Sequence, residues 1–257
     1  MARYLVVGSG ATGVHFAQTM LERGETVELI DVGYSPPAVE HPELDFSALK
    51  DAGTEGGRYF LGAASEAVVY PAPDAKPYGF PPSKAHVFRR PGEFRLEEKG
   101  FAPLLSFAKG GLAEAWTGGS YELRDEELAD FPFAPGALRP HYATVASRIG
   151  IAATADDLES FSPLTPGSLA PLPADSHSAW LLGRYQSRRA RLHARGVALG
   201  RSRVAVLSRD LGTRGRCTEL GRCLWGCPRG ALYAPSQTLA ALMSHPGFSY
   251  RPGLLVH

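Results

Sequence analysis

Cysteine is scarce in this chain, and long apolar runs are missing. Three cysteines occur among 257 residues, all within one short segment, and an odd number in one place is not typical of a secreted disulfide framework. No apolar run approaches the roughly 18 residues that a membrane-spanning helix needs. The N-terminus also lacks the basic, apolar and small-residue regions of a signal peptide. We therefore expect no membrane span and a cytoplasmic location.

An excess of charge of one sign is lacking as well. The chain has 27 basic and 26 acidic side chains and a net charge of +1, so no general field would attract nucleic acid or a membrane surface. The one basic run, residues 188–195, favours a solvated helix face over a phosphate or RNA patch. A hydrophobic share of 44% over this length is ordinary for a globular protein with a full core.

Glycine and proline, in contrast, are plentiful. Glycine (29) and proline (21) lie mostly between residues 33 and 174. They predict long irregular connections, with no long element over 32–107 and a loop over 151–175. The periodic segments elsewhere predict strands at 3–8, 26–31, 197–207 and from 248 onward, and helices at 14–23, 125–129, 139–149, 176–195 and 232–244.

The first 33 residues have the pattern of a dinucleotide-binding βαβ unit. The turn Gly8-Ser9-Gly10-Ala11-Thr12-Gly13 follows a strand and opens a helix, and Asp31 ends the second strand 18 positions beyond Gly13. In such a turn Gly8 permits the tight bend, Gly10 lets the backbone approach a diphosphate and Gly13 lets the helix pack closely. Amides at the helix start bind the anion, and Asp31 accepts hydrogen bonds from the ribose hydroxyls. Because its carboxylate would repel a 2′-phosphate, Asp31 argues against NADP.

FAD and NAD proteins share this unit, so the turn alone does not choose between them. Asp31-Val32-Gly33 resembles the acidic-x-Gly ending of flavoproteins of the two-dinucleotide-binding type, whose glycine lets the chain turn past the adenosine. This favours FAD over NAD. We therefore predict an α/β fold, Rossmann-like and FAD-binding, of the two-dinucleotide-binding type, with long irregular insertions.

Two later motifs resemble the glucose–methanol–choline (GMC) oxidoreductase superfamily. Residues 109–119, KGGLAEAWTGG, lie in a small-residue loop at about 107–120 and are similar to its flavin-contacting Gly-Gly loop, in the Trp-Thr form of the pyranose-oxidase-like branch. Residues 222–231 with Ser236 are similar to a G-C-P-x-G-A…S segment of bacterial members, and residues 251–257 to the strand beside the adenine. The whole of 1–257 then corresponds to the N-terminal FAD-binding domain, with its βαβ core at 3–33 and a cysteine-containing segment at 217–231.

The resemblance implies FAD as cofactor and oxidation of a CH–OH group of an alcohol or sugar by hydride transfer to the flavin. The flavin would lie against Gly110, Gly111, Ala115, Trp116 and Thr117, although an ordinary core tryptophan explains Trp116 nearly as well. In pyranose-oxidase-like members a His of this loop carries the flavin covalently. Ala115 stands at that position here, so we predict non-covalent FAD.

The family's catalytic His and its His or Asn partner lie in a C-terminal substrate domain that has no counterpart here. We therefore assign no catalytic residue and no role to His141, His245 or His257. The late strand that closes the family's FAD domain is also missing. We expect a truncated fold whose first strand has an exposed apolar edge and which binds FAD weakly unless a partner chain completes it. A complementing, non-catalytic subunit and an NAD-dependent Rossmann dehydrogenase are the alternatives.

The cysteines match no complete metal site. Cys223-x3-Cys227-Pro228 is similar to the end of a ferredoxin ligand run, but a [4Fe–4S] cluster needs four thiolates. A zinc site would need a fourth ligand such as His245, at no recognised spacing. For Cys217, Cys223 and Cys227 we favour buried structural thiols over a metal site or a redox pair, and we assign no metal ligand.

Overall fold

The computed structural model describes residues 2–68, 80–97, 99–101 and 103–256, which form two compact units. Unit 1 comprises the described residues up to Trp116, together with Glu219–Pro228 and those from Ala234 onward. Unit 2 comprises Thr117–Thr218 and Arg229–Tyr233. The loop at 107–120 and the segment at 217–231 are thus each divided between the units.

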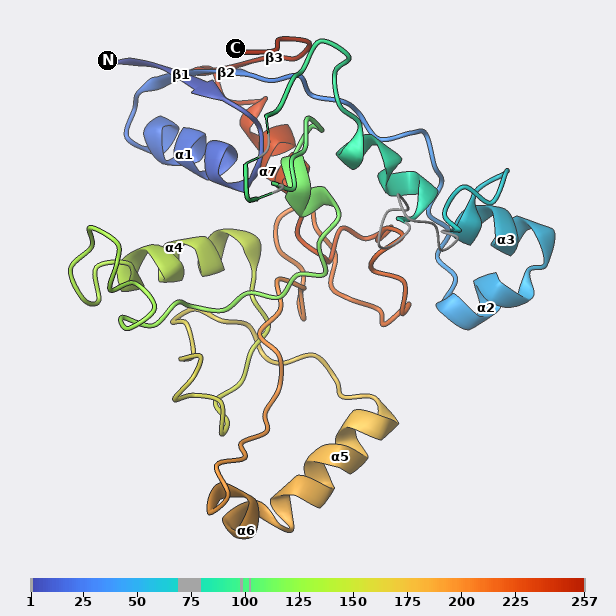
Figure 1. The fold of residues 1–257 in the computed structure, drawn as a ribbon, viewed down its shortest axis with the longest axis vertical. Coiled ribbons are helices and arrows are strands. Elements are labelled where there is room, and N and C mark those ends of the chain that lie inside the picture. Colours follow the sequence, from blue (N-terminus) through green and yellow to red (C-terminus); the bar gives the residue numbers. More distant parts are fainter. Residues whose placement is uncertain (1, 69–79, 98, 102, 257) are drawn as a thin grey trace. The chain divides into compact units, whose positions relative to one another are not determined.

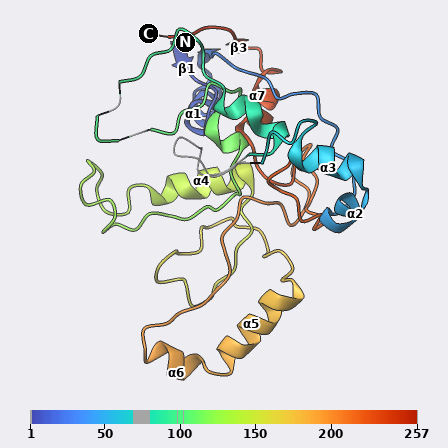
Figure 2. The same cartoon turned by 45° about the vertical axis from the view of Figure 1, so that its right-hand side comes forward.

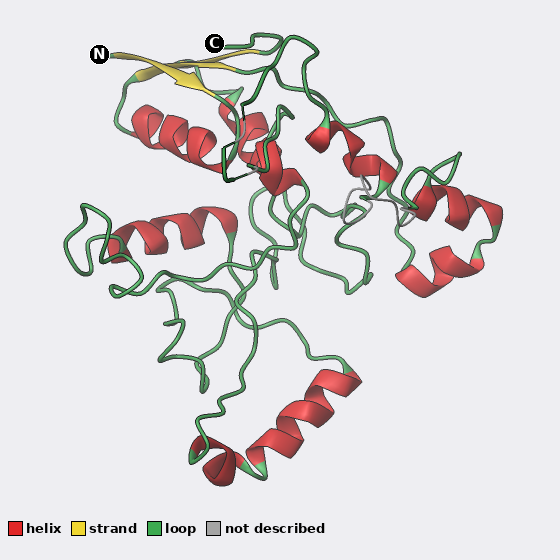
Figure 3. Cartoon of the chain, viewed as in Figure 1, coloured by secondary structure: helices red, strands yellow, loops and turns green. Residues whose placement is uncertain are grey.

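Unit 1 contains a small sheet with helices packed against it (Figure 1). Loops connect most of the elements of both units (Figure 3). The elements of unit 1 are β1 (Arg3–Val7), α1 (Ala11–Glu22), β2 (Thr26–Ile30), α2 (Phe46–Asp51), α3 (Thr54–Leu61), the 3-10 helices η1 (Pro82–Phe88) and η2 (Gly111–Glu114), α7 (Pro235–Leu242) and β3 (Phe248–Arg251). Those of unit 2 are α4 (Arg139–Ile149), α5 (Ser176–Gln186) and α6 (Arg189–His193).

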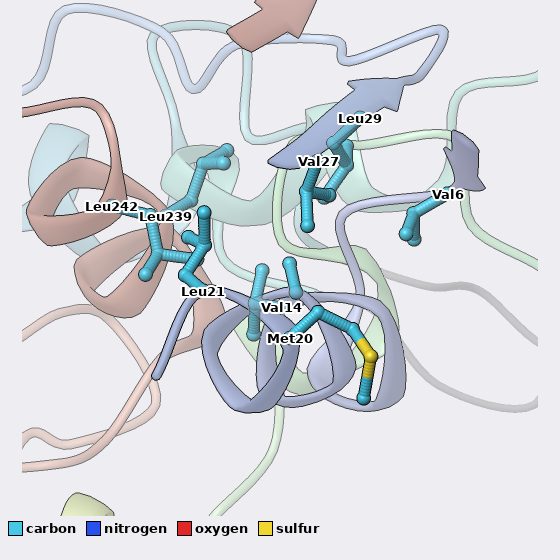
Figure 4. Packing of buried hydrophobic residues seen from close by; sticks show 9 residues of the cluster. Val6, Val14, Met20, Leu21, Val27, Leu29, Leu239 and Leu242 are labelled. Atoms are coloured by element: carbon cyan, nitrogen blue, oxygen red, sulfur yellow. The ribbon is translucent and has the colours of Figure 1, made fainter. Parts of the chain in front are cut away.

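The sheet has three parallel strands in the order β1-β2-β3. Alternate residues such as Val6, Val27 and Leu29 point to one face, where α1 and α7 cover them (Figure 4). In that core α1 contributes Val14, Ala17, Met20 and Leu21, and α7 contributes Leu239 and Leu242. The predicted α/β class is confirmed at the level of a mixed fold with a small parallel sheet.

β1 lies at an edge of this sheet. The N–H of Gly8 donates to the carbonyl of Ile30. Since hydrogen bonds alternate along a parallel strand, the amides of Leu5 and Val7 point away from β2. Their side chains are 63% and 58% exposed, and no described strand pairs with β1 on that side. The expected apolar edge on the first strand is confirmed.

The βαβ unit lies close to its predicted bounds, but α1 begins three residues early. The helix starts at Ala11 instead of Val14, because Gly10 is extended and its carbonyl already accepts the N–H of Val14. Thr12 and Gly13 therefore belong to the first helical turn. Gly24, with φ of +79°, follows the end of the helix as predicted.

Two predicted elements are wrong. Residues 125–129 form turns, because the carboxylate of Asp125 accepts the N–H of Gly136 and holds the segment in a turn. Residues 197–207 form only isolated bridges at Val204 and Val206. Arg203, in the middle of this segment, is 2% exposed and forms an ion pair with Asp156 over 3.1 Å. A polar residue of a half-buried strand would instead point to solvent.

Other predictions differ in length. The helix at 176–195 is divided into α5 and α6 at Arg188, whose φ of −126° and ψ of +11° are not helical. α7 is shorter than 232–244 because Pro235 occupies its first turn, where proline is favoured. The helix at 139–149 and the loop over 151–175 are confirmed. In the described residues of 32–107 the helices are short, and residues 69–79, 98 and 102 lie outside the described part.

Candidate dinucleotide-binding site

The turn between β1 and α1 leaves the start of α1 open. Gly8 has φ of +92°, a conformation that favours glycine, and Gly10 precedes the helix in an extended conformation. Within the described residues no side chain caps α1, and its first turn holds no acidic residue. The N–H groups of residues 11–13 have no helical carbonyl to bind. The positive end of α1 is therefore available to an anion.

Two glycines of this turn have different surroundings. A Cβ added at Gly13 would overlap the carbonyl oxygen of Gly8, so a larger residue would push α1 away from β1. A Cβ added at Gly10 would meet nothing within 4 Å. The close packing predicted for Gly13 is confirmed, and the space beside Gly10 is open to a ligand that approaches the backbone.

The second glycine turn lies on the first. The N–H of Gly110 donates to Oγ of Ser9 over 2.9 Å, and a Cβ on Gly111 would lie 3.1 Å from Cα of Gly10. Both Gly110 and Gly111 have positive φ, at +93° and +67°. The N–H of Lys109 donates to the carbonyl of Tyr34, which attaches this loop to the segment after β2. The fold thus brings together two glycine motifs that are far apart in sequence.

Asp31 lies behind the glycine turn and is 7% exposed. Its Oδ2 accepts the N–H of Ser9 over 3.1 Å and also the Ser9 hydroxyl. Burial raises the pKa of Asp31, while hydrogen bonds from Ser9 and from the N–H groups of Gly33 and Val32 oppose the rise. In this arrangement Asp31 braces the turn. Its contact with a ribose stays a prediction.

Tyr250 is a neighbour of this site that the sequence did not indicate. A Cβ added at Gly33, whose φ is +65°, would overlap the Tyr250 hydroxyl oxygen. Burial and the charge of Asp31 raise the pKa of Tyr250 to about 12, so its hydroxyl keeps its proton. Nζ of Lys109 lies 5.8 Å from the centroid of its ring. The alternation of side chains along β3 indicates that Tyr250 shares the inner face of the sheet with Phe248. It does not indicate the contact between Tyr250 and Gly33.

Glu114 joins η2 to α7. Its Oε1 accepts the N–H of Ser236 over 2.9 Å, and a Cβ added at Gly110 would overlap the Glu114 carboxylate. Burial raises the pKa of Glu114, whereas the Ser236 hydrogen bonds and the charge of Lys84 oppose the rise. Glu114 therefore already supplies an anion at the start of α7, which leaves α1 as the open helix start beside the glycine turns.

The remaining residues of the predicted flavin loop are less closely grouped. Ala115 follows η2 and is half-buried, as is Trp116. Thr117 is exposed and is the first residue of unit 2. Gly110 and Gly111 contact the turn between β1 and α1 directly.

The prediction of three buried structural thiols is wrong. Cys223 is exposed, Cys217 and Cys227 are half-buried, and none of the three forms a disulfide in the described part of the chain. The segment is anchored instead by Arg222, which is 1% exposed and donates to the Tyr59 hydroxyl over 2.6 Å. In the described part of the chain no group of His, Cys, Asp and Glu side chains is arranged to hold a metal ion.

Models of known protein families and curated protein sequences show no match to this chain. None of the described helices has the length and apolar character to cross a membrane. His141 and His245 are exposed, and His257 lies outside the described residues.

Proposed function

We propose that this chain binds FAD through β1, α1 and β2, and that it is the FAD-binding part of an oxidoreductase. The observation that carries the proposal is the open start of α1 beside two stacked glycine turns. A diphosphate placed there would accept the N–H groups of residues 11–13 and face the positive end of the helix dipole. The dipole contributes about 0.3–1 kcal/mol to such binding. The residues present therefore fit the diphosphate of a dinucleotide.

FAD is favoured over NAD by the second turn. Gly110 and Gly111 place a second stretch of backbone against the turn between β1 and α1, in conformations that favour glycine. The resemblance to GMC oxidoreductases implies that this loop contacts the flavin. The positive φ of Gly33 allows the chain to bend immediately after Asp31, as expected for passage around an adenosine. A compact NAD site needs the first turn but not the second.

The reaction is proposed from the resemblance to GMC oxidoreductases. FAD would accept a hydride from the CH–OH carbon of an alcohol or sugar. Ala115 offers no nucleophile at the position where related proteins attach the flavin, so the cofactor would be held without a covalent bond. Ser9 and Asp31 would keep the first turn in place, and Ser9 would hold Gly110 against it.

Purification in the presence of FAD tests this proposal. The expected product is yellow, and acid releases a flavin that co-migrates with FAD. A parallel preparation with NAD in place of FAD is the control and should retain no nucleotide. A protein that retains NAD but not FAD contradicts the proposal, and so does a folded protein that leaves the fluorescence of FAD unchanged in a titration.

A further inference from the structure

The near-neutral chain contains one strongly basic segment. Residues 176–209 include eight arginines and no Asp or Glu, whereas the net charge of the whole chain is only +1. The rest of the chain therefore has a net charge of −7. α5, α6 and the residues up to Gly196 form what we call the arginine hairpin, in which the two helices follow each other at an angle (Figures 1 and 2). Its arginines are Arg184, Arg188, Arg189, Arg191 and Arg195.

One carboxylate fixes the arginine hairpin on its inner side. Asp157 accepts two hydrogen bonds from Arg189, over 2.7 and 2.6 Å, and one from the Tyr185 hydroxyl over 2.6 Å. Nε2 of His193 lies 2.9 Å from the same carboxylate. The hydrogen bonds from Arg189 and Tyr185 hold the pKa of Asp157 well below its usual range. The hairpin is thus attached through Arg189, and only this arginine is neutralised there.

The outer side of the hairpin combines cations with apolar side chains. Arg184, Arg188, Arg191 and Arg195 are exposed, and no ion pair joins any of them to a described carboxylate. Trp180 is 60% exposed. Trp180 and Arg184 are four residues apart on α5 and share a face, while the buried Tyr185 points inward.

We propose that the arginine hairpin docks on the surface of an anionic lipid bilayer. Guanidinium groups bind phosphate through paired hydrogen bonds, and tryptophan is favoured at the boundary between headgroups and acyl chains. Trp180, together with the 46%-exposed Val197 that directly follows the hairpin, favours a bilayer over nucleic acid, because a phosphodiester backbone offers nothing to apolar side chains. The hairpin has a net charge of +5 and the rest of the chain −4, so the hairpin is the part of the chain that an anionic surface attracts.

Vesicle flotation with the full chain tests this docking. The chain should float with phosphatidylcholine vesicles that contain phosphatidylglycerol, should not float with phosphatidylcholine alone, and should be released by salt. An R188Q/R191Q variant should bind roughly 30-fold more weakly, since each arginine near such a surface strengthens binding about fivefold. Arg189 is retained in this variant, so the attachment to Asp157 persists. Replacing Trp180 by Phe should abolish the vesicle-induced shift in tryptophan fluorescence.

The matched control is R58Q/R90Q, which removes two exposed arginines of unit 1 and should bind vesicles as the wild-type chain does. Unchanged circular dichroism of both variants shows that the fold is kept. Failure of the folded wild-type chain to bind anionic vesicles overturns the proposal. So does an equal loss in both double variants. Salt-sensitive binding to duplex DNA, single-stranded RNA or polyglutamate without binding to vesicles assigns the hairpin to another partner and overturns it too.

Discussion

The hydroxyl oxygen of Ser9 accepts a hydrogen bond from the N–H of Gly110 over 2.9 Å, although the two residues are 101 positions apart. The same hydroxyl donates to Asp31. A side chain that is 1% exposed thus joins the turn after β1, the end of β2 and the second glycine turn. This junction keeps Gly111 in contact with Gly10 beside the start of α1.

Replacing Ser9 by Ala should lower the free energy of unfolding by about 1–3 kcal/mol, because the buried N–H of Gly110 and the carboxylate of Asp31 each lose a partner. Urea unfolding measures the change. The control is S249A, on the exposed outer face of β3, which should change the free energy by no more than about 0.5 kcal/mol. Equal effects of the two substitutions would show that Ser9 does not link the turns.

Gly13→Ala should be destabilising by about 1–3 kcal/mol, because the added methyl overlaps the Gly8 carbonyl and separates α1 from β1. Gly57→Ala in α3 is the matched control, since an added Cβ there meets nothing within 4 Å. The control should stabilise the protein by about 1 kcal/mol, the helix preference of Ala over Gly. Thermal unfolding of both variants separates the outcomes, and a stable G13A protein would refute the close packing.

His86 should make the protein less stable in acid. Burial, then the charge of Lys84, lowers the pKa of His86 from 6.5 to about 4. As pH falls below 6.5 the unfolded chain takes up a proton that the folded chain resists, so stability is lost between pH 6.5 and about 4. Above that window the group has no effect on the pH dependence.

The test compares unfolding free energies at pH 7 and pH 5 for the wild-type chain and for His86→Leu, which cannot titrate. The difference between the two pH values should be smaller in the variant. His141→Leu, an exposed position on α4, should behave like the wild-type chain. An H86L protein with the full wild-type loss in acid would contradict the effect of burial.

The open edge of β1 should cause self-association. Lysine at Leu5 and Val7 should reduce light scattering at high protein concentration, because charged residues on an edge strand oppose pairing with another chain. Both side chains are more than half exposed, so stability should change by no more than about 0.5 kcal/mol. Leu104→Lys replaces a similarly exposed side chain that belongs to no strand and should leave the scattering high. Equal scattering of all three proteins would argue against association through β1.

The βαβ unit could be predicted because its signals are local. Apolar alternation marks β1 and β2, and a glycine turn with a helical repeat marks α1. The contact of Gly110 with Ser9 could not, since no periodicity relates residues so far apart. The burial of Arg203 and Arg222 could not be predicted either. Arginine is rarely buried without a partner, and the partners Asp156 and Tyr59 come from distant segments of the sequence.

The central claim is that the open start of α1 binds the diphosphate of FAD, and Gly10→Val tests it directly. Gly10 has φ of −63° and ψ of 176°, which any residue adopts, and an added Cβ meets no atom of the protein within 4 Å. The valine should leave the unfolding midpoint unchanged but fill the space in front of the amides. FAD titration followed by flavin fluorescence should then give a Kd at least about tenfold higher, a loss of roughly 1.4 kcal/mol. An unchanged Kd in a folded G10V protein would contradict the account.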